Sequence, residues 1–281
     1  MSGNIFNTTG ALGTREIENG SILEMTMANV NLSRVNPTRF FRNTEFGFND
    51  IISNTVVTLS PGVPVNSLDI TYPTSAVLIS VASTSTDDDV AGIGALTVRV
   101  RGLDANYREQ DEIVILTGQT PVDTTNTFIR VNDLFVITAG SSGVNVGYIH
   151  ASDSADTFTA GGEPNTRLYM SIPPTHNLSK TMVFTVPDGF LWTPKNLYIQ
   201  TDATSTDTIE IKLYVTRKTA GIDIEQLQDI FYVQQGGVQI NFENNRQMRS
   251  RDDFRITTER ISGNGNKQVH MKLFSILKKL Y

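Results

Sequence analysis

Short runs of β-branched and aromatic residues, separated by Gly, Pro, Asn and Asp, recur along most of this sequence. The clearest run is Ile209–Val215, in which apolar residues alternate with Glu210, Lys212 and Tyr214. A period of two is typical of a strand with one buried face, and strands spaced roughly every 8 to 12 residues are typical of sandwiches and barrels. The chain shows no fixed-period repeat and no heptads. We therefore predict an all-β protein.

Composition and charge narrow the class further. Apolar residues make up 39% and charged residues 19% of the chain, a balance that Thr- and Val-rich strands with polar turns produce. The absence of cysteine excludes disulfides and thiolate metal sites. A net charge of −6 disfavours general attraction to nucleic acid or to an anionic membrane. No apolar run approaches the roughly 20 residues of a membrane span. The N-terminus lacks the basic-then-apolar order of a signal peptide, so we expect no membrane partner and folding in a cytosol.

The length of 281 residues is enough for two domains, and a change in composition suggests where they divide. Residues 151–165 are small, polar and rich in glycine, as expected of a long loop or an interdomain crossing. Residues 1–50 show no clean periodicity. We predict two jelly-roll-like β-sandwich domains with an extended N-terminal arm, divided as follows: arm 1–50, first sandwich 51–165, second sandwich 166–281.

For several runs the sequence also predicts burial, position in the sheet or a turn. The run Ala76–Ala82 is apolar almost throughout, which predicts burial on both faces. The run Val269–Leu277 has apolar residues on both faces, which predicts a central or covered strand. A tight hairpin is expected at Asn132-Asp133, between two apolar runs. We expect Leu168–Ile172 to be the first strand of the second sandwich, and region 224–231 fits either a short helical turn or a strand.

The chain carries no constellation that predicts catalysis or metal binding. Asp87–Asp89 lacks the spacing of a calcium loop, so we expect a solvated loop tip. The wide separation of His150, His176 and His270 in the sequence is typical of isolated surface or hairpin histidines. The carboxylates of region 109–112 predict a charged turn rather than a glycosidase pair. We predict no catalytic residue, no cofactor, no metal site and no enzymatic activity.

Contact residues are the remaining candidates. The phenylalanines and arginines of the arm either pack on the body or dock on a neighbouring subunit. A concentration of arginines in region 246–260 is interleaved with Asp252, Asp253 and Glu259, which favours intersubunit ion pairs over phosphate or DNA contact. The single tryptophan either caps a core or forms an exposed contact. The predicted contact residues are Arg34, Arg39, Phe40, Phe41, Arg42, Trp192, Arg246, Arg249 and Arg251.

The stretch Ile172–Gly189 combines a proline-rich turn with a strand that ends in Val-Pro-Asp-Gly. Here the sequence resembles a family of bacteriophage virion structural proteins that is common among marine and cyanobacterial phages. Further matches are the strand Tyr214–Arg217, the run Asp253–Ile256 with the later Gly-Asn-Gly, and the upstream run Val98–Asp104. The resemblance covers roughly residues 95–281. The matching residues of the central stretch are Pro173, Asn177, Ser179, Phe184, Thr185, Val186, Pro187 and Gly189.

Members of this family look like capsid-associated or tail-associated β proteins. The resemblance implies a capsid decoration or cement protein that stabilises the particle through contacts with the major capsid protein or other virion proteins. By analogy it implies a ring-like homo-oligomer, with a trimer favoured, located in a virion that assembles in the host cytoplasm. The alternative is a fibre or baseplate module that binds a host receptor or glycan. Its sign would be a cluster of exposed aromatic residues, for which Tyr107, Trp192 and Tyr198 are candidates. We expect no nucleic-acid partner.

Overall fold

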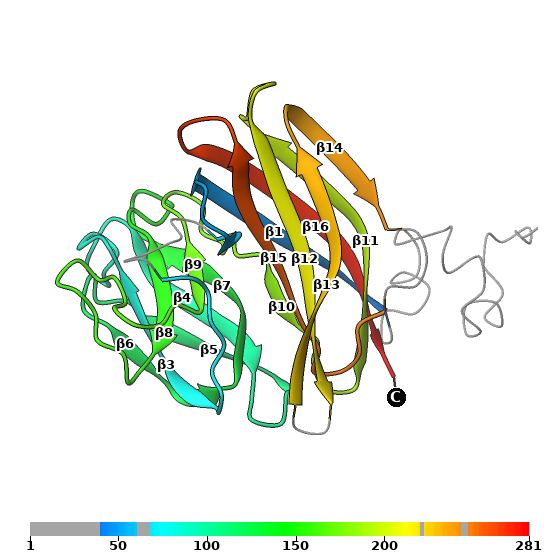
Figure 1. Ribbon diagram of the computed structural model, residues 1–281. Helices are drawn as coiled ribbons and strands as arrows, with labels where there is room; N and C mark the ends of the chain where they lie inside the picture. The colour runs from blue at the N-terminus through cyan, green and yellow to red at the C-terminus, as the bar shows by residue number, and fades with distance from the viewer. Residues whose placement is uncertain (1–39, 61–67, 220–221, 243–246, 281) are drawn as a thin grey trace, which may run out of the picture.

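The computed structural model describes residues 40–60, 68–219, 222–242 and 247–280, and it confirms the all-β prediction (Figure 1). These residues form strands and turns, with no helix among them. The strands gather into two β-sandwiches that lie side by side, each with its own hydrophobic core (Figure 1).

The larger sandwich, which we call the roll, is built from two antiparallel sheets. The first sheet contains, in spatial order, β1 (Phe40–Ile52), β16 (Lys267–Lys279), β11 (Phe190–Thr201) and β14 (Gly236–Asn241). The second contains β10 (Val183–Thr185), β15 (Asp253–Ser262), β12 (Thr208–Thr219) and β13 (Ile222–Val233), with the short β2 (Val57–Thr58) also paired to β15. If β1 and β10 to β16 are counted from one to eight along the chain, the sheet orders are 1-8-3-6 and 2-7-4-5. This is the arrangement of a jelly roll.

Alternation of apolar and polar residues builds the core of the roll. In β12, Ile209 and Leu213 are buried between the two sheets, as the period of two predicts. In the other sheet, β16 pairs with β1 on one side and β11 on the other, which confirms the central position predicted for Val269–Leu277. Ile52, at the end of β1, joins the same core.

The smaller sandwich, which we call the insert, enters the chain between the first and second strands of the roll. One of its sheets contains, in spatial order, β6 (Val122–Phe128), β3 (Val77–Ser83), β8 (Ile149–Asp153) and β9 (Met170–Ile172). The other contains β5 (Glu109–Ile115), β4 (Ala95–Leu103) and β7 (Arg130–Ala139). Successive residues of β3 from Ile79 to Ser83 are all buried, so the predicted burial of both faces is confirmed.

Two domain boundaries differ from the predicted ones. Residues 40–50, expected in the arm, belong to β1, which pairs with β16 from Phe40 to Ile52. The side chains of Leu168, Met170 and Ile172 are buried in the core of the insert, so the insert continues past residue 165. A composition change marks a loop, but it does not tell which sandwich the next strand joins. The rest of the predicted arm, residues 1–39, lies outside the described residues.

The predicted hairpin at Asn132-Asp133 is wrong, because β7 runs unbroken through both residues. Their side chains have partners outside the strand instead. Asn132 exchanges two hydrogen bonds of 2.9 and 3.0 Å with the backbone of Thr185 in β10. Asp133 accepts a hydrogen bond from the hydroxyl of Ser179. Two adjacent polar residues therefore mark the place where the insert meets the chain that re-enters the roll.

Candidate assembly surfaces

A buried ion pair fixes the insert to the roll. Arg130 of β7 donates from Nε and Nη2 to the two carboxylate oxygens of Asp253 in β15, each at 2.9 Å. Both residues are only 3% exposed. The Asp253 carboxylate also accepts a 2.6 Å hydrogen bond from the Thr185 hydroxyl and lies 3.1 Å from the Lys218 ammonium. A buried pair that is bidentate and fully hydrogen-bonded is costly to break by removing one partner.

Aromatic contacts surround the same ion pair. The Arg130 guanidinium lies 4.7 Å from the centre of the Tyr72 ring. The Tyr72 hydroxyl donates to the backbone carbonyl of Phe254 in the roll, at 3.3 Å. Burial, and then the negative charge of Asp253, raises the pKa of Tyr72 above its ordinary value. The insert thus covers the outer face of the roll where β10 and β15 lie.

Two carboxylates line a cavity between the roll and the insert. Glu45 of β1 and Asp133 of β7 both line a space of about 310 Å³, together with Arg101 and Phe184. Burial, followed by the charge of Asp133, raises the pKa of Glu45 to about 8. Burial likewise raises the pKa of Asp133 to about 6, although the hydrogen bond from Ser179 opposes the shift. Deprotonation of Glu45 is therefore unfavourable while the domains stay packed.

Two arginines of the predicted basic cluster, Arg251 and Arg255, have carboxylate partners within the chain. Arg251 is exposed, and its Nε lies 3.0 Å from the carboxylate of Asp188. Its guanidinium also lies 5.4 Å from the centre of the Tyr107 ring, at the tip of an insert turn. The hydrogen bond from Arg251 holds the pKa of Asp188 below its ordinary value. Arg255 forms a similar pair with Glu225, with Nε at 2.9 Å. The Arg255 pair joins two strands of the roll, and Arg251 contacts both the roll and the insert.

Trp192 lies in the centre of the roll core and is completely buried. Its ring centroid is 5.6 Å from that of Phe184 and 4.9 Å from that of Phe254. Of the two predicted alternatives, the core position is confirmed and the exposed contact is wrong. The physical reason is that β11 crosses the middle of its sheet, so one face of the strand always points inward.

The predicted arm anchors fall at the start of β1. Phe40 is buried, whereas Phe41 is 40% exposed with its ring centroid 6.2 Å from that of Phe190. The backbone of Arg42 pairs with β16. Arg249 is exposed, and its role as a contact residue stays a prediction. The predicted residues outside the described part of the chain are Arg34, Arg39 and Arg246.

An apolar patch lies along β13, the last strand of its sheet. Leu227, Ile230 and Tyr232 have exposed fractions of 47%, 41% and 58%. Their cross-strand neighbours in β12 are Tyr214, Lys212 and Glu210, so all three belong to the outer face. We call these three residues the β13 patch. Among the described residues no further strand pairs with the far side of β13, which leaves a row of backbone donors and acceptors open.

The end of the β12–β13 hairpin adds apolar surface on the opposite face. Ile222 and Ile224 are 64% and 46% exposed. A register shift between Leu213 and Tyr214 breaks the strict alternation of β13, which explains why the sequence also fitted a helical turn. The strand alternative for region 224–231 is confirmed. The sequence did contain a sign of this exposed surface, since region 222–232 has more apolar residues than one buried strand face requires.

Asp88 is a structural carboxylate rather than part of a solvated tip. It is fully buried, and its two oxygens accept hydrogen bonds from the Ser83 hydroxyl and from three backbone N–H groups. Those N–H groups belong to Ala95, Val146 and Gly147, at 2.7, 2.9 and 2.8 Å. The expected solvated loop is thus wrong for this residue. The four donors tie the loop of Asp88 to the end of β3, the start of β4 and the loop at 146–147.

The three histidines occupy two different settings. His150 is buried, with its Nδ1 2.8 Å from the Ser171 hydroxyl, and burial lowers its pKa to about 4. The prediction of an isolated surface histidine is wrong here. His176 and His270 are exposed and flank the same ring, with centroids 6.0 and 4.5 Å from that of Phe48. The fold thus brings together two residues that are distant in sequence.

Within the part of the chain that the structure describes, no group of three or more His, Asp or Glu side chains could hold a metal ion. The same residues include no helix with the length and hydrophobicity that a bilayer crossing requires.

No family model matches the sequence, and neither does a curated protein. Solved structures with some likeness include the structure of infectious bursal disease virus Gt strain, at 12% identity, with 86% of this chain and 73% of that chain covered and a TM-score of 0.25. Another is the crystal structure of the infectious bursal disease virus VP2 subviral particle, at 9% identity, with 86% and 72% covered and a TM-score of 0.19. At these values the likenesses carry no argument about function, which has to be argued from the chain's own residues.

Proposed function

We propose that this chain is a virion structural protein that works by binding copies of itself and other virion proteins. The observation that carries the proposal is the β13 patch, together with the open backbone edge of the same strand. An exposed apolar edge strand is a liability for a monomer, because it can pair with any other strand. A chain that is built to assemble uses such an edge instead of protecting it.

The β13 patch can supply part of the free energy of a contact. Leu227, Ile230 and Tyr232 keep roughly half of their surface in water, so burying the remainder contributes about 1 kcal/mol each. Backbone pairing along a 12-residue strand adds direction and register. Several such contacts in a closed ring multiply through avidity, which suits a protein that must resist dilution and force.

The finer form of the proposal is a bacteriophage capsid decoration or cement protein that assembles as a trimer. The sequence resemblance around Ile172–Gly189 supports the phage assignment, and a jelly roll is a fold that viral capsid domains use. Fold alone does not specify function, so the jelly roll counts here as an analogy. In a closed trimer the β13 edge of one copy contacts a different surface of the next, whereas a dimer would pair β13 with itself.

The test is the mass of the purified full chain in solution, measured by light scattering, followed by electron cryomicroscopy of the parent particle. We expect a mass of three chains, and density on the particle into which the roll and insert can be traced. A chain that stays monomeric at about 100 µM and binds no viral head or tail piece would overturn the proposal.

The predicted docking arm needs a separate test. Since Phe40–Ile52 is a strand of the roll, the deletion has to stop at residue 39. We expect the shortened protein to keep its β fold and to bind the particle more weakly. Unchanged binding would reject the arm as a docking element.

A further inference from the structure

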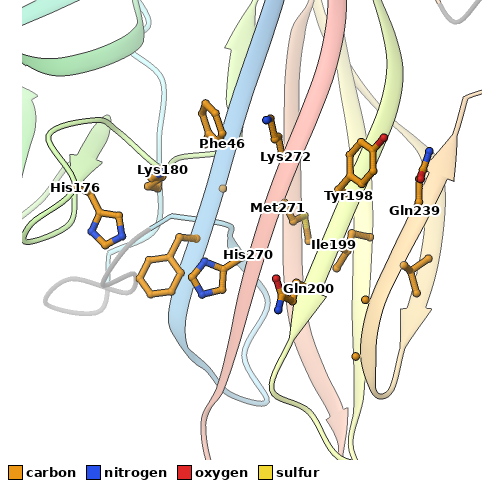
Figure 2. Close-up of a pocket in the computed structure, with 15 residues that line it drawn as sticks. Phe46, His176, Lys180, Tyr198, Ile199, Gln200, Gln239, His270, Met271 and Lys272 are labelled. Atoms are coloured by element: carbon orange, nitrogen blue, oxygen red, sulfur yellow. The ribbon is translucent and has the colours of Figure 1, made fainter.

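The outer face of the sheet β1-β16-β11-β14 carries a groove whose lining is set by strand register (Figure 2). Residues that lie directly opposite one another on neighbouring strands point to the same face. Two such rows cross the sheet. The first row consists of Phe46, Lys272, Tyr198 and Gln239. The second row consists of Phe48, His270, Gln200 and Gly237.

The segment before β10 overhangs one end of these rows and turns the flat face into a groove. It contributes Lys180, which lies near Phe46 in Figure 2, and His176, whose ring centroid is 6.0 Å from that of Phe48. The Lys180 ammonium lies 4.5 Å from the centre of the Phe46 ring, and the Lys272 ammonium lies 5.5 Å from it. The groove has a volume of about 540 Å³, which is in the range of sites for small ligands.

Positive charge gathers in the groove, on Lys180 and Lys272. Among the described residues, no carboxylate lies within ion-pair distance of Lys180 or Lys272. Burial, and then the charge of Lys272, lowers the pKa of Lys180. Burial, and then His176 and Lys180, lowers the pKa of His270, while Asp202 and Asp50 oppose that shift. Cations that disfavour one another in a chain of net charge −6 form a local site for an anion.

We propose that this groove binds an acidic oligosaccharide, in which a carboxylate or sulfate group meets Lys180 and Lys272. The ammonium groups supply charge-assisted hydrogen bonds to the anionic group. Tyr198, which is 41% exposed, offers an apolar ring face to the C–H face of a sugar. The exposed amides of Gln200 and Gln239 can donate to and accept from hydroxyl groups.

The same features fit a saccharide better than a single-stranded nucleic acid. Nucleic-acid grooves present aromatic faces on which successive bases stack, within an extended basic track. Here the Phe46 ring is already in contact with two ammonium groups, and the Phe274 ring lies 4.6 Å from the Lys272 ammonium, so both phenylalanine rings are already in contact with cations. The amides and glycines of β11 and β14 suit hydroxyl groups instead.

The experiment is titration calorimetry of the full chain with four probes. They are trigalacturonate, a chondroitin sulfate disaccharide, neutral maltotriose and a short single-stranded oligonucleotide. We expect one or both acidic saccharides to bind and maltotriose to bind at least about tenfold more weakly, with affinity falling as salt is added. The two acidic probes distinguish a carboxylate ligand from a sulfated one.

Lys272→Gln and Lys180→Gln are each expected to weaken the acidic saccharide about tenfold. Lys279→Gln, the same change at an exposed position of the same strand, should leave affinity unchanged, and thermal melting checks that all variants fold. Tighter binding of the oligonucleotide, absence of saccharide binding at millimolar concentration, or affinity that neither lysine variant alters would each overturn the inference. None of these outcomes bears on assembly through β13, which is tested by mass.

Discussion

The insert and the roll differ in how the backbone groups of their edge strands are bonded. In the insert, β5 and β6 are edge strands of the two sheets, and side chains of β5 bond the backbone of β6. Gln110 Nε2 donates to the carbonyl of Thr127 at 2.6 Å. The Glu112 carboxylate accepts the N–H groups of Thr125 and Asn126 at 2.7 and 2.8 Å. Three backbone groups of β6 that could recruit another strand are thereby occupied.

In the roll, one end of the sheet β10-β15-β12-β13 is covered and the other is not. The insert covers the β10 and β15 end through Arg130 and Asp253. At the far end, β13 presents the β13 patch and an edge with no strand partner among the described residues. One chain can therefore protect some sheet edges and leave another available for assembly.

Opening the covered end should have the largest effect. Arg130→Met leaves Asp253 buried beside weaker partners, so we expect the free energy of unfolding to fall by about 3–5 kcal/mol. Urea unfolding followed by fluorescence measures the change. Arg251→Met, which removes an arginine from an exposed pair with Asp188, is the control and should cost less than about 1 kcal/mol. Equal losses in the two variants would contradict a closed, buried contact.

Placing a charge on the open edge should abolish assembly while sparing the fold. Ile230→Lys puts an ammonium in the centre of the β13 patch, and we expect association to weaken by about 2 kcal/mol or more. The matched control is Ile115→Lys on β5, where the wild-type side chain is 55% exposed. Light scattering should give a smaller mass for the first variant only. Loss of assembly in both variants, or in neither, would break the contrast between the two edges.

Loosening the closed edge of the insert should have a moderate effect. Glu112→Gln removes the negative charge that two β6 N–H groups share, so we expect a loss of about 1–2 kcal/mol in unfolding free energy. Glu109→Gln, at an exposed position of the same strand, should change it by less than about 0.5 kcal/mol. Chemical denaturation of both variants gives the comparison. A loss for Glu109→Gln as large as that for Glu112→Gln would show that the carboxylate does not close the edge.

The smallest expected effect concerns the carboxylates between the domains. The pKa of Glu45 is raised to about 8 in the folded protein, so the native state holds this proton more tightly than the unfolded chain. Stability from this group is complete below its ordinary pKa of 4.5 and is lost as pH rises towards about 8. Glu45→Gln should therefore gain about 1 kcal/mol relative to wild type at the upper end, since Glu45 is only half-buried.

The measurement is the difference in melting temperature between wild type and Glu45→Gln across this pH window. The comparison with Glu45→Gln is needed because other groups also titrate in this window and change the melting temperature of both proteins. His150, with a pKa lowered to about 4, contributes stability that is lost as pH falls below 6.5, the opposite direction. A difference that does not change with pH would exclude Glu45 as the titrating group.

Local pattern predicted the strands well and their partners poorly. The alternation in Ile209–Val215 and the two apolar faces of Val269–Leu277 appear in the structure as a half-buried and a central strand. The same reasoning failed at Asn132-Asp133, because polar residues inside a strand look like a turn unless their distant partners are known. The expectation for Asp88 failed for the same reason, since its four donors come from the end of β3, the start of β4 and the loop at 146–147.

The assembly surface shows a similar limit. Apolar residues at 222–232 were visible, but their exposure depends on β13 being the last strand of its sheet. The groove on the other sheet was less visible still, since Phe46, Tyr198 and Lys272 come from three strands far apart in sequence. A resemblance around Ile172–Gly189 suggested the class of protein, yet it indicated neither surface.

The all-β class, the lack of cysteine chemistry and the period of the strands can be read from the sequence, because these properties depend on residues that are neighbours along the chain. The folded structure is needed to learn which strands end a sheet, that one sandwich is inserted into the other, and which charges are buried together. Those properties depend on long-range pairing, and a period of two states which face of a strand is apolar without stating what will cover it.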